Sequence, residues 1–223
     1  MSKPTFRLGV IVNPFAGIGG ALALKGSDGK DIREKALASG AEKKANEKMA
    51  KALSVLEALS GQFLVVTAAG EMGEDACKSM GFEHEVIYSP SHAQTEGEDS
   101  ERAAKALIKA NVDLILFAGG DGTARNICSV VGSAVPVLGV PAGCKIHSGV
   151  YCVSPSAAGH VVSQMIAGEL VSEMDAEVRD IDEDAFRRGK VIAKHYGEMR
   201  APHHLNDEWA VFPTMLKLLL GIW

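Results

Sequence analysis

The sequence predicts an α/β fold, with three α/β/α layers around a mostly parallel, Rossmann-like sheet, followed by the start of a second, β-containing unit. Short apolar runs alternate with segments whose apolar residues recur every three or four positions, as in strands and their covering helices. The run at residues 114–118 is apolar on both faces, which is typical of a central parallel strand. Turns containing glycine or proline follow three of the runs.

The strands are predicted from the apolar runs and the helices from apolar periodicity. Strands are expected at residues 8–12, 63–66, 85–88, 114–118 and 135–140. A helix is expected at residues 46–59, a shorter one near residues 71–80, and a third is opened by Thr95 and Glu98, which resemble a capping box. A fourth follows Thr123, because apolar residues recur there at helical spacing.

Beyond residue 150 the pattern changes. Ser154 followed by Pro155 predicts the start of a helix, since proline suits the first helical position. Residues 175–184 and 190–196 are suggestive of β structure. We therefore expect one α/β domain at residues 1–150 and a partial second domain at residues 151–223.

The composition limits the classes of protein that the 223 residues can form. The chain is 47% hydrophobic and 23% charged, as in soluble globular domains. A net charge of -5 without a basic stripe argues against a nucleic-acid binder. The four cysteines form no C-x-x-C pair, which fits a reduced, cytoplasmic protein. No signal peptide and no stable membrane insertion are expected, because a strand-like run begins near Met1 and no apolar stretch approaches a membrane span.

The most informative stretch is Gly119-Gly120-Asp121-Gly122-Thr123, directly after the central apolar run. Glycines let backbone N–H groups approach a phosphate, because they have no Cβ atom. The helix that follows would point its positive N-terminal end at the same place. The plain alternative is a tight turn between a strand and a helix, but five specific residues in this context favour phosphate chemistry.

Three such turns are expected to meet. Residues 13–20, 119–123 and 141–143 each follow a predicted strand. Ligands of open parallel sheets bind beyond the carboxyl ends of the strands, which is where all three turns would lie.

Common nucleotide and hydrolase motifs are absent from the sequence. A G-x-G-x-x-G fingerprint starting at Gly17 would need a third glycine where Leu22 stands. A P-loop fails because Lys30 is followed by Asp31. There is no G-x-S-x-G elbow. Hydride transfer at a standard Rossmann site and P-loop hydrolysis are therefore disfavoured.

The pairing of Asn13-Pro14-x-x-Gly17 with the glycine–aspartate motif resembles the NAD kinase, diacylglycerol kinase and sphingosine kinase superfamily. Within it, residues 17–29, 124–127 and 139–148 resemble the bacterial and archaeal ATP-NAD kinase-like proteins. The resemblance covers roughly residues 7–200.

The resemblance implies transfer of a phosphoryl group from ATP, or from polyphosphate, to the 2′-hydroxyl of NAD, with Mg²⁺ as cofactor. Asp121 would be the catalytic residue, accepting the hydroxyl proton or orienting the hydroxyl near the Mg²⁺ ion, and it is also the candidate ligand of that ion. Phosphoryl transfer needs mainly positioning and charge stabilisation, which a glycine turn, a helix N-terminus and Mg²⁺ can supply. The family also implies a homo-oligomer and a β-rich second domain, of which residues 151–223 would be a truncated part.

The candidate nucleotide-binding residues come from the three turns and their flanks. Lys25, Arg125 and Lys145 are the candidate cations, although each also fits a solvated surface charge. His147 fits either a contact with ribose or phosphate or a structural histidine. The full set is Asn13, Gly17, Gly19, Gly20, Lys25, Gly119, Gly120, Gly122, Thr123, Asn126, Gly143, Lys145 and His147.

Two alternatives to an NAD kinase stay open at this point. A lipid kinase of the same superfamily would need an apolar acceptor surface, which only residues 216–223 offer. A non-catalytic module would bind ATP or NAD without turnover. The acidic residues 180–184 could suggest a metal site, but their spacing fits a solvated loop better.

Overall fold

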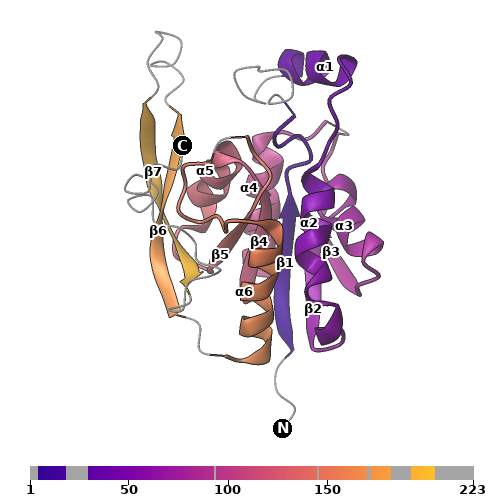
Figure 1. The fold of residues 1–223 in the computed structure, drawn as a ribbon, viewed down its shortest axis with the longest axis vertical. Coiled ribbons are helices and arrows are strands. Elements are labelled where there is room, and N and C mark those ends of the chain that lie inside the picture. Colours follow the sequence, from indigo (N-terminus) through magenta and orange to yellow (C-terminus); the bar gives the residue numbers. More distant parts are fainter. Residues whose placement is uncertain are drawn as a thin grey trace.

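Five of the apolar runs form a single parallel sheet. A computed structural model describes residues 5–18, 30–92, 94–144, 146–169, 172–181 and 192–203. The sheet has the order β3-β2-β1-β4-β5, and a separate antiparallel pair, β6-β7, follows (Figure 1). The predicted α/β class with a small second β unit is therefore confirmed. The strands are β1 (Phe6–Val12), β2 (Phe63–Ala68), β3 (His84–Tyr88), β4 (Leu114–Gly119), β5 (Val137–Pro141), β6 (Ser172–Ile181) and β7 (Ala193–His203).

The strand register brings three chain segments to one edge of the sheet. Val12 of β1 lies beside Ala118 of β4, which in turn lies beside Val140 of β5. The strand order reverses between β1 and β4, and ligands of open α/β sheets bind at such a reversal. The fold therefore places the turns after β1, β4 and β5 where a ligand is expected.

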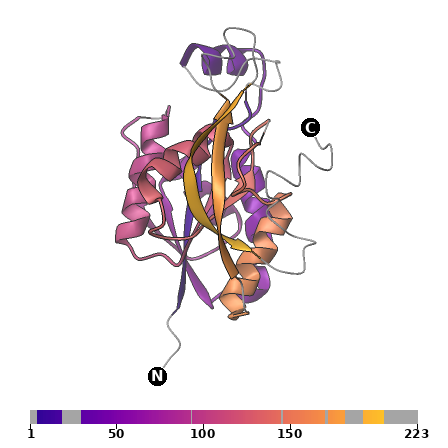
Figure 2. The ribbon, with the colours of Figure 1, turned by 90° about the vertical axis from the view of Figure 1, so that its left-hand side faces the viewer.

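Helices cover both faces of the sheet. Buried residues of α2, α3 and α6 pack on one face, while those of α4 and α5 pack on the other. Helix α1 lies beyond the carboxyl ends of the strands (Figure 1), and β6 and β7 pack against α5 (Figure 2). None of the helices in the described ranges has the length and hydrophobicity that a membrane span requires. The helices are α1 (Lys30–Ala38), α2 (Ala45–Ser54), α3 (Glu74–Ser79), α4 (Gly97–Lys109), α5 (Asp121–Val131) and α6 (Pro155–Ala167).

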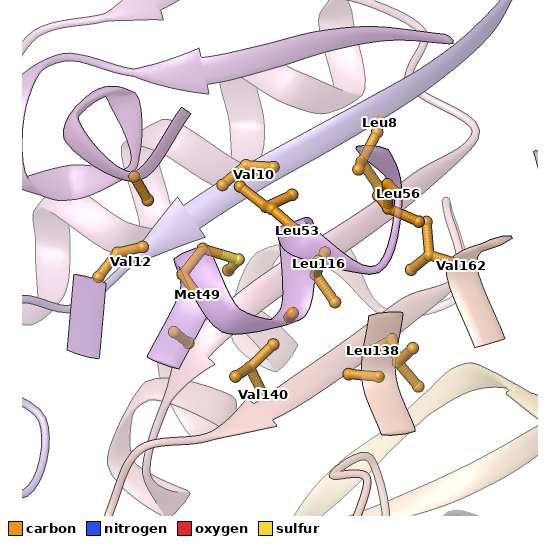
Figure 3. Close-up of a cluster of buried hydrophobic side chains, with 14 of the residues drawn as sticks. Leu8, Val10, Val12, Met49, Leu53, Leu56, Leu116, Leu138, Val140 and Val162 are labelled. Carbon is orange, nitrogen blue, oxygen red and sulfur yellow. The ribbon is translucent and has the colours of Figure 1, made fainter. Parts of the chain in front are cut away.

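The larger buried cluster joins β1, β4 and β5 to α2 and α6. Met49 and Leu53 of α2 lie against Val10 of β1, and Val162 of α6 lies beside Leu138 of β5 (Figure 3). All of these side chains are buried. Because α6 packs here, the chain after residue 150 first returns to the sheet before it forms β6. The predicted domain boundary at residue 150 falls just before this helix and stays a prediction.

Several local predictions were wrong in detail. The helix expected at residues 46–59 ends at Ser54 and is followed by a short 3₁₀ turn at Glu57–Leu59. The one expected at 71–80 is divided by Gly73, whose φ of 142° is not helical, into a 3₁₀ turn and α3. The strand expected from residue 135 begins at Val137.

The predicted capping box was displaced by one residue. Helix α4 is capped by Glu96, and the Glu96 N–H donates to the Asp99 carboxylate at 2.8 Å. Thr95 and Glu98 therefore do not form the box. Carboxylates can cap a helix as hydroxyls do, because both accept a hydrogen bond from the free N–H groups of its first turn. The predicted cap of α6 is confirmed, since Ser154 accepts a hydrogen bond from the Ala157 N–H.

The contact between α2 and α6 depends on Gly159. A Cβ atom there would lie 2.2 Å from the Ala52 carbonyl oxygen and 2.8 Å from Val55 Cβ. We expect Gly159→Val to lower the free energy of unfolding by about 1–3 kcal/mol or more, because α2 and α6 would have to move apart and open the core to make room for the new side chain. Urea unfolding measures the change. Ser156→Val, at a half-exposed position of the same helix, is the control and should change stability by less than about 0.5 kcal/mol. Equal stability of the two variants would contradict the close packing.

Candidate functional site

Backbone hydrogen bonds join the three turns at the carboxyl edge of the sheet. The Asn13 N–H donates to the Ala118 carbonyl at 2.9 Å. The N–H groups of Ala142 and Gly143 both donate to the Gly119 carbonyl at 2.9 Å. The turns after β1, β4 and β5 are therefore one connected structure, as the parallel strands led us to expect.

Small residues allow these turns to approach so closely. A Cβ atom on Gly143 would lie 2.7 Å from Gly120 Cα, so neither position accepts a side chain without movement of the backbone. Gly17 has a φ of 79°, and a Cβ atom there would lie 2.4 Å from the Ala142 carbonyl oxygen. Gly17, Gly120 and Gly143 thus serve turn-to-turn packing, and they leave backbone at the surface of the edge.

Asn13 and Thr123 tie the first turn to the start of α5. The Asn13 amide nitrogen donates to the Thr123 hydroxyl at 2.9 Å, and its amide oxygen accepts from the Phe15 N–H at 3.1 Å. Thr123 is buried. Both side chains therefore hold the edge together in this structure. Asn126 packs against Gly97 at the start of α4, because a Cβ atom on Gly97 would lie 2.1 Å from its amide nitrogen.

The Asp121 carboxylate, in the first turn of α5, accepts two backbone hydrogen bonds and lies within hydrogen-bonding distance of two side chains. One oxygen accepts from the His147 N–H at 2.7 Å and lies 2.9 Å from His147 Nδ1. The other accepts from the Ser148 N–H at 3.0 Å and lies 2.7 Å from Ser148 Oγ. A carboxylate held by charge-assisted bonds of this kind is fixed in position. Asp121 therefore fastens the segment after β5 over the N-terminus of α5.

Ser148 carries this connection on to β6. Its fully buried hydroxyl accepts from the Arg179 N–H at 3.1 Å and lies 2.8 Å from the Arg179 carbonyl. Because a hydroxyl has one proton, it donates either to this carbonyl or to Asp121. A second link runs from α5 to the same hairpin, where Arg125 pairs with Asp180 at 2.8 Å and lies 5.5 Å from the Tyr196 ring. Arg125 thus already has an anionic partner.

Of the Asp121 and His147 side chains, that of His147 is the more accessible. It exposes 24% of its side chain, against 5% for Asp121. An imidazole that donates from Nδ1 to a carboxylate is held in one orientation. A substrate therefore reaches His147 more easily than it reaches Asp121.

Tyr151 supports the turn before Asp121 from below. Its hydroxyl donates to the Gly120 carbonyl at 2.6 Å, and its ring packs against Phe117 of β4 at 5.3 Å between centroids. Burial raises the pKa of Tyr151 well above its usual value, and the negative charges of Asp121 and Asp180 add to the effect. The phenol therefore stays protonated and keeps donating to Gly120.

A cleft opens beside this edge. It has a volume of about 290 Å³ and lies between the turns after β1 and β5 and the start of α2. Backbone of Gly17 and Gly143 forms part of its wall, with Cys144, Glu42, Lys44 and Lys48 around it. The cleft is at the small end of the range for ligand pockets.

The described residues offer no metal centre of their own. Within them, no group of three or more histidine, cysteine, aspartate or glutamate side chains could hold an ion. Asp121 uses both oxygens on His147 and Ser148, and Asp180 pairs with Arg125. The other acidic residues at 182–184 lie outside the described ranges.

The structure brings some of the predicted site residues together and gives others a packing role. Asp121, His147, Gly17, Gly120 and Gly143 meet at the edge. Predicted residues that lie outside the described ranges are Gly19, Gly20, Lys25 and Lys145. Gly119 is the last residue of β4, and Gly122 follows Asp121 in α5.

Sequence reasoning missed three residues of the edge. Ser148 and Tyr151 lie in a stretch that was considered, but no local pattern marks them as partners of the turn after β4. Lys48 stands in an ordinary amphipathic helix, and only the packing of α2 beside β1 brings it to the cleft.

Removal of the Ser148 hydroxyl tests how strongly the edge depends on it. We expect Ser148→Ala to lower the free energy of unfolding by about 1–3 kcal/mol, because the Arg179 N–H and a buried Asp121 oxygen each lose a partner. Ser129→Ala, which removes an exposed hydroxyl from α5, is the control and should stay within about 0.5 kcal/mol. Denaturant unfolding measures both variants, and a loss no larger than the control's would contradict the assigned role.

Comparison with known proteins gives one family. Residues 8–170 match the model of the ATP-NAD kinase N-terminal domain. A search of curated protein sequences gives no significant match. The matched region covers more than half of the 223 residues and contains most of β1, all of β2 to β5 and the three turns. The chain therefore belongs to the ATP-NAD kinase family, whose fold and type of chemistry suit the edge described above.

Proposed function

We propose that this protein transfers a phosphoryl group from ATP, or from polyphosphate, to the 2′-hydroxyl of NAD and so forms NADP. Membership of the ATP-NAD kinase family supports a kinase that uses these nucleotides. The observation that carries the proposal is the pair of Asp121 and His147, which lies where the turns of β4 and β5 meet.

In the proposed reaction the 2′-hydroxyl oxygen attacks the terminal phosphorus of the donor. The new P–O bond forms as the bond to the leaving phosphate breaks, which releases ADP or a shortened polyphosphate. The hydroxyl proton passes to the His147 ring and from there to solvent. We assign the proton to His147 because each Asp121 oxygen already accepts a backbone N–H from residue 147 or 148 and lies close to one of their side chains. Asp121 then acts as a positioning residue that orients the ring and stabilises its positive charge.

Backbone supplies the rest of the proposed site. Gly17, Gly120 and Gly143 present no side chains that would keep a phosphate away from the edge. No side chain caps the N-terminus of α5, and that terminus favours negative charge. These features position a phosphoryl group and stabilise its charge, which is most of what the transfer requires.

The described residues do not fit a protein-held Mg²⁺ site, since Asp121 has no oxygen without a hydrogen bond and no acidic cluster stands beside it. We therefore propose Mg²⁺ only as part of the metal–nucleotide substrate, because this ion usually keeps several waters and binds the phosphates. A cytoplasmic location is proposed from the free cysteines, and a homo-oligomer from the family resemblance alone.

Replacement of His147 tests the proposed proton acceptor. His147→Gln keeps a polar side chain but cannot take the proton, so we expect the rate of NADP formation to fall about 10²- to 10⁴-fold. His84→Gln is the control, because His84 begins β3 at the opposite edge of the sheet, and it should keep the wild-type rate. The assay combines NAD, Mg²⁺ and either ATP or polyphosphate, and mass spectrometry identifies the product and the position of the new phosphate.

Three results would count against the proposal. If His147→Gln forms NADP at the wild-type rate, the ring is not the proton acceptor. If the wild-type chain binds ATP or NAD but forms no phosphorylated product, the protein is a non-catalytic nucleotide-binding module and not a kinase. Phosphorylation of a diacylglycerol or sphingoid acceptor in place of NAD would instead favour the lipid kinase.

A further inference from the structure

We infer that the cleft beside α2 binds the phosphate chain of a nucleotide, and that Lys48 is the cation that holds it. This inference rests on the proposed function for the identity of the nucleotide, but the binding of phosphate does not depend on transfer. The ligand chemistry is a diphosphate or triphosphate, as in the donor ATP or the pyrophosphate bridge of the acceptor NAD.

The charges around the cleft single out Lys48. Lys44 lies 3.4 Å from Glu42, and Lys43 pairs with Glu71 at 2.7 Å and stacks on Phe15. Lys48 is half-buried and, among the described residues, forms no ion pair or hydrogen bond through its side chain. A partly desolvated ammonium group gains from an anionic partner more than an exposed one does.

The walls of the cleft suit an anion. Gly17 and Gly143 contribute backbone without a Cβ atom, so a phosphate can approach the chain closely. No side chain caps the N-terminus of α2 at Lys44, and that end of the helix adds positive potential. The cleft volume of about 290 Å³ suits a phosphate chain better than a complete dinucleotide.

The position of the cleft connects it with the proposed reaction. Gly143 lines the cleft and packs directly against Gly120, which precedes Asp121. A phosphate chain in the cleft would therefore end beside the pair of Asp121 and His147. Lys48 comes from α2 and Gly143 from the turn after β5, so the site exists only in the folded chain.

Cys144 provides a direct reporter, because it is exposed and lines the cleft. We expect inorganic pyrophosphate to slow the alkylation of Cys144 by N-ethylmaleimide. The reaction is run at constant ionic strength, and peptide mass spectrometry measures the extent of alkylation. Lys48→Met should raise the pyrophosphate concentration needed for half-protection about ten-fold or more, since the charge-assisted contact is lost. Lys51→Met is the control, because Lys51 lies on the exposed side of the same helix, and it should leave protection unchanged.

Two buried cysteines report on the fold in the same experiment. Burial raises the pKa of Cys77 and of Cys152 to about 12, so both thiols should stay unreactive in every folded variant. The proposed site is supported if pyrophosphate protects Cys144 only weakly in Lys48→Met while Cys77 and Cys152 of that variant stay unreactive. The proposed site is overturned if pyrophosphate does not protect Cys144 in the wild-type protein. It is also overturned if Lys48→Met and Lys51→Met weaken the protection equally.

Repeating the protection with ATP and with NAD identifies the nucleotide. Protection at lower concentrations of ATP assigns the cleft to the donor, and protection at lower concentrations of NAD assigns it to the acceptor; either result supports the site. Protection without any formation of NADP would contradict the proposed kinase but support the phosphate site. Formation of NADP without protection would leave the kinase in place and overturn the site.

Discussion

The structure of the whole edge depends on one buried carboxylate. Asp121 accepts two hydrogen bonds from backbone N–H groups and lies within hydrogen-bonding distance of a hydroxyl and an imidazole, all from residues 147 and 148. These contacts fix the segment after β5 over the start of α5, and Ser148 extends the connection to β6. A buried charge is costly unless it is fully hydrogen-bonded, and here its partners come from a different part of the chain. The requirement to satisfy Asp121 thus determines where His147 lies.

Close backbone contact is the second constraint on the edge. The turns after β1, β4 and β5 touch through Gly17, Gly120 and Gly143, and a Cβ atom on Gly17 or Gly143 would overlap the neighbouring backbone. Tyr151 fills the space below and bonds the Gly120 carbonyl. A rigid base of this kind suits phosphoryl transfer, because that chemistry is catalysed mainly by positioning and by preorganised charge. The family match covers the same strands and turns, so fold and proposed chemistry coincide in one region.

Most cations near the edge have an acidic partner, and Lys48, at the cleft, is the exception among those described here. Arg125 is paired with Asp180, Lys43 with Glu71 and Lys44 with Glu42. Lys48 stands apart from these pairs at the cleft, next to glycine backbone. The proton-accepting and phosphate-binding functions that we propose would then lie on neighbouring elements, joined by the contact between Gly120 and Gly143.

Sequence patterns were enough to predict the alternation of strands and helices, the five parallel strands and the meeting of three turns, because apolar periodicity is local and parallel strand geometry is general. It also marked Asp121, since glycines around a carboxylate after a buried strand form an unusual local pattern. The partners of Asp121 and the place of Lys48 followed only from tertiary structure. Residues 121 and 148 are far apart in the chain, and α2 reaches the cleft only because it packs on β1. Hydrogen-bond partners and uncompensated charge depend on what surrounds a residue in space, which no local pattern specifies.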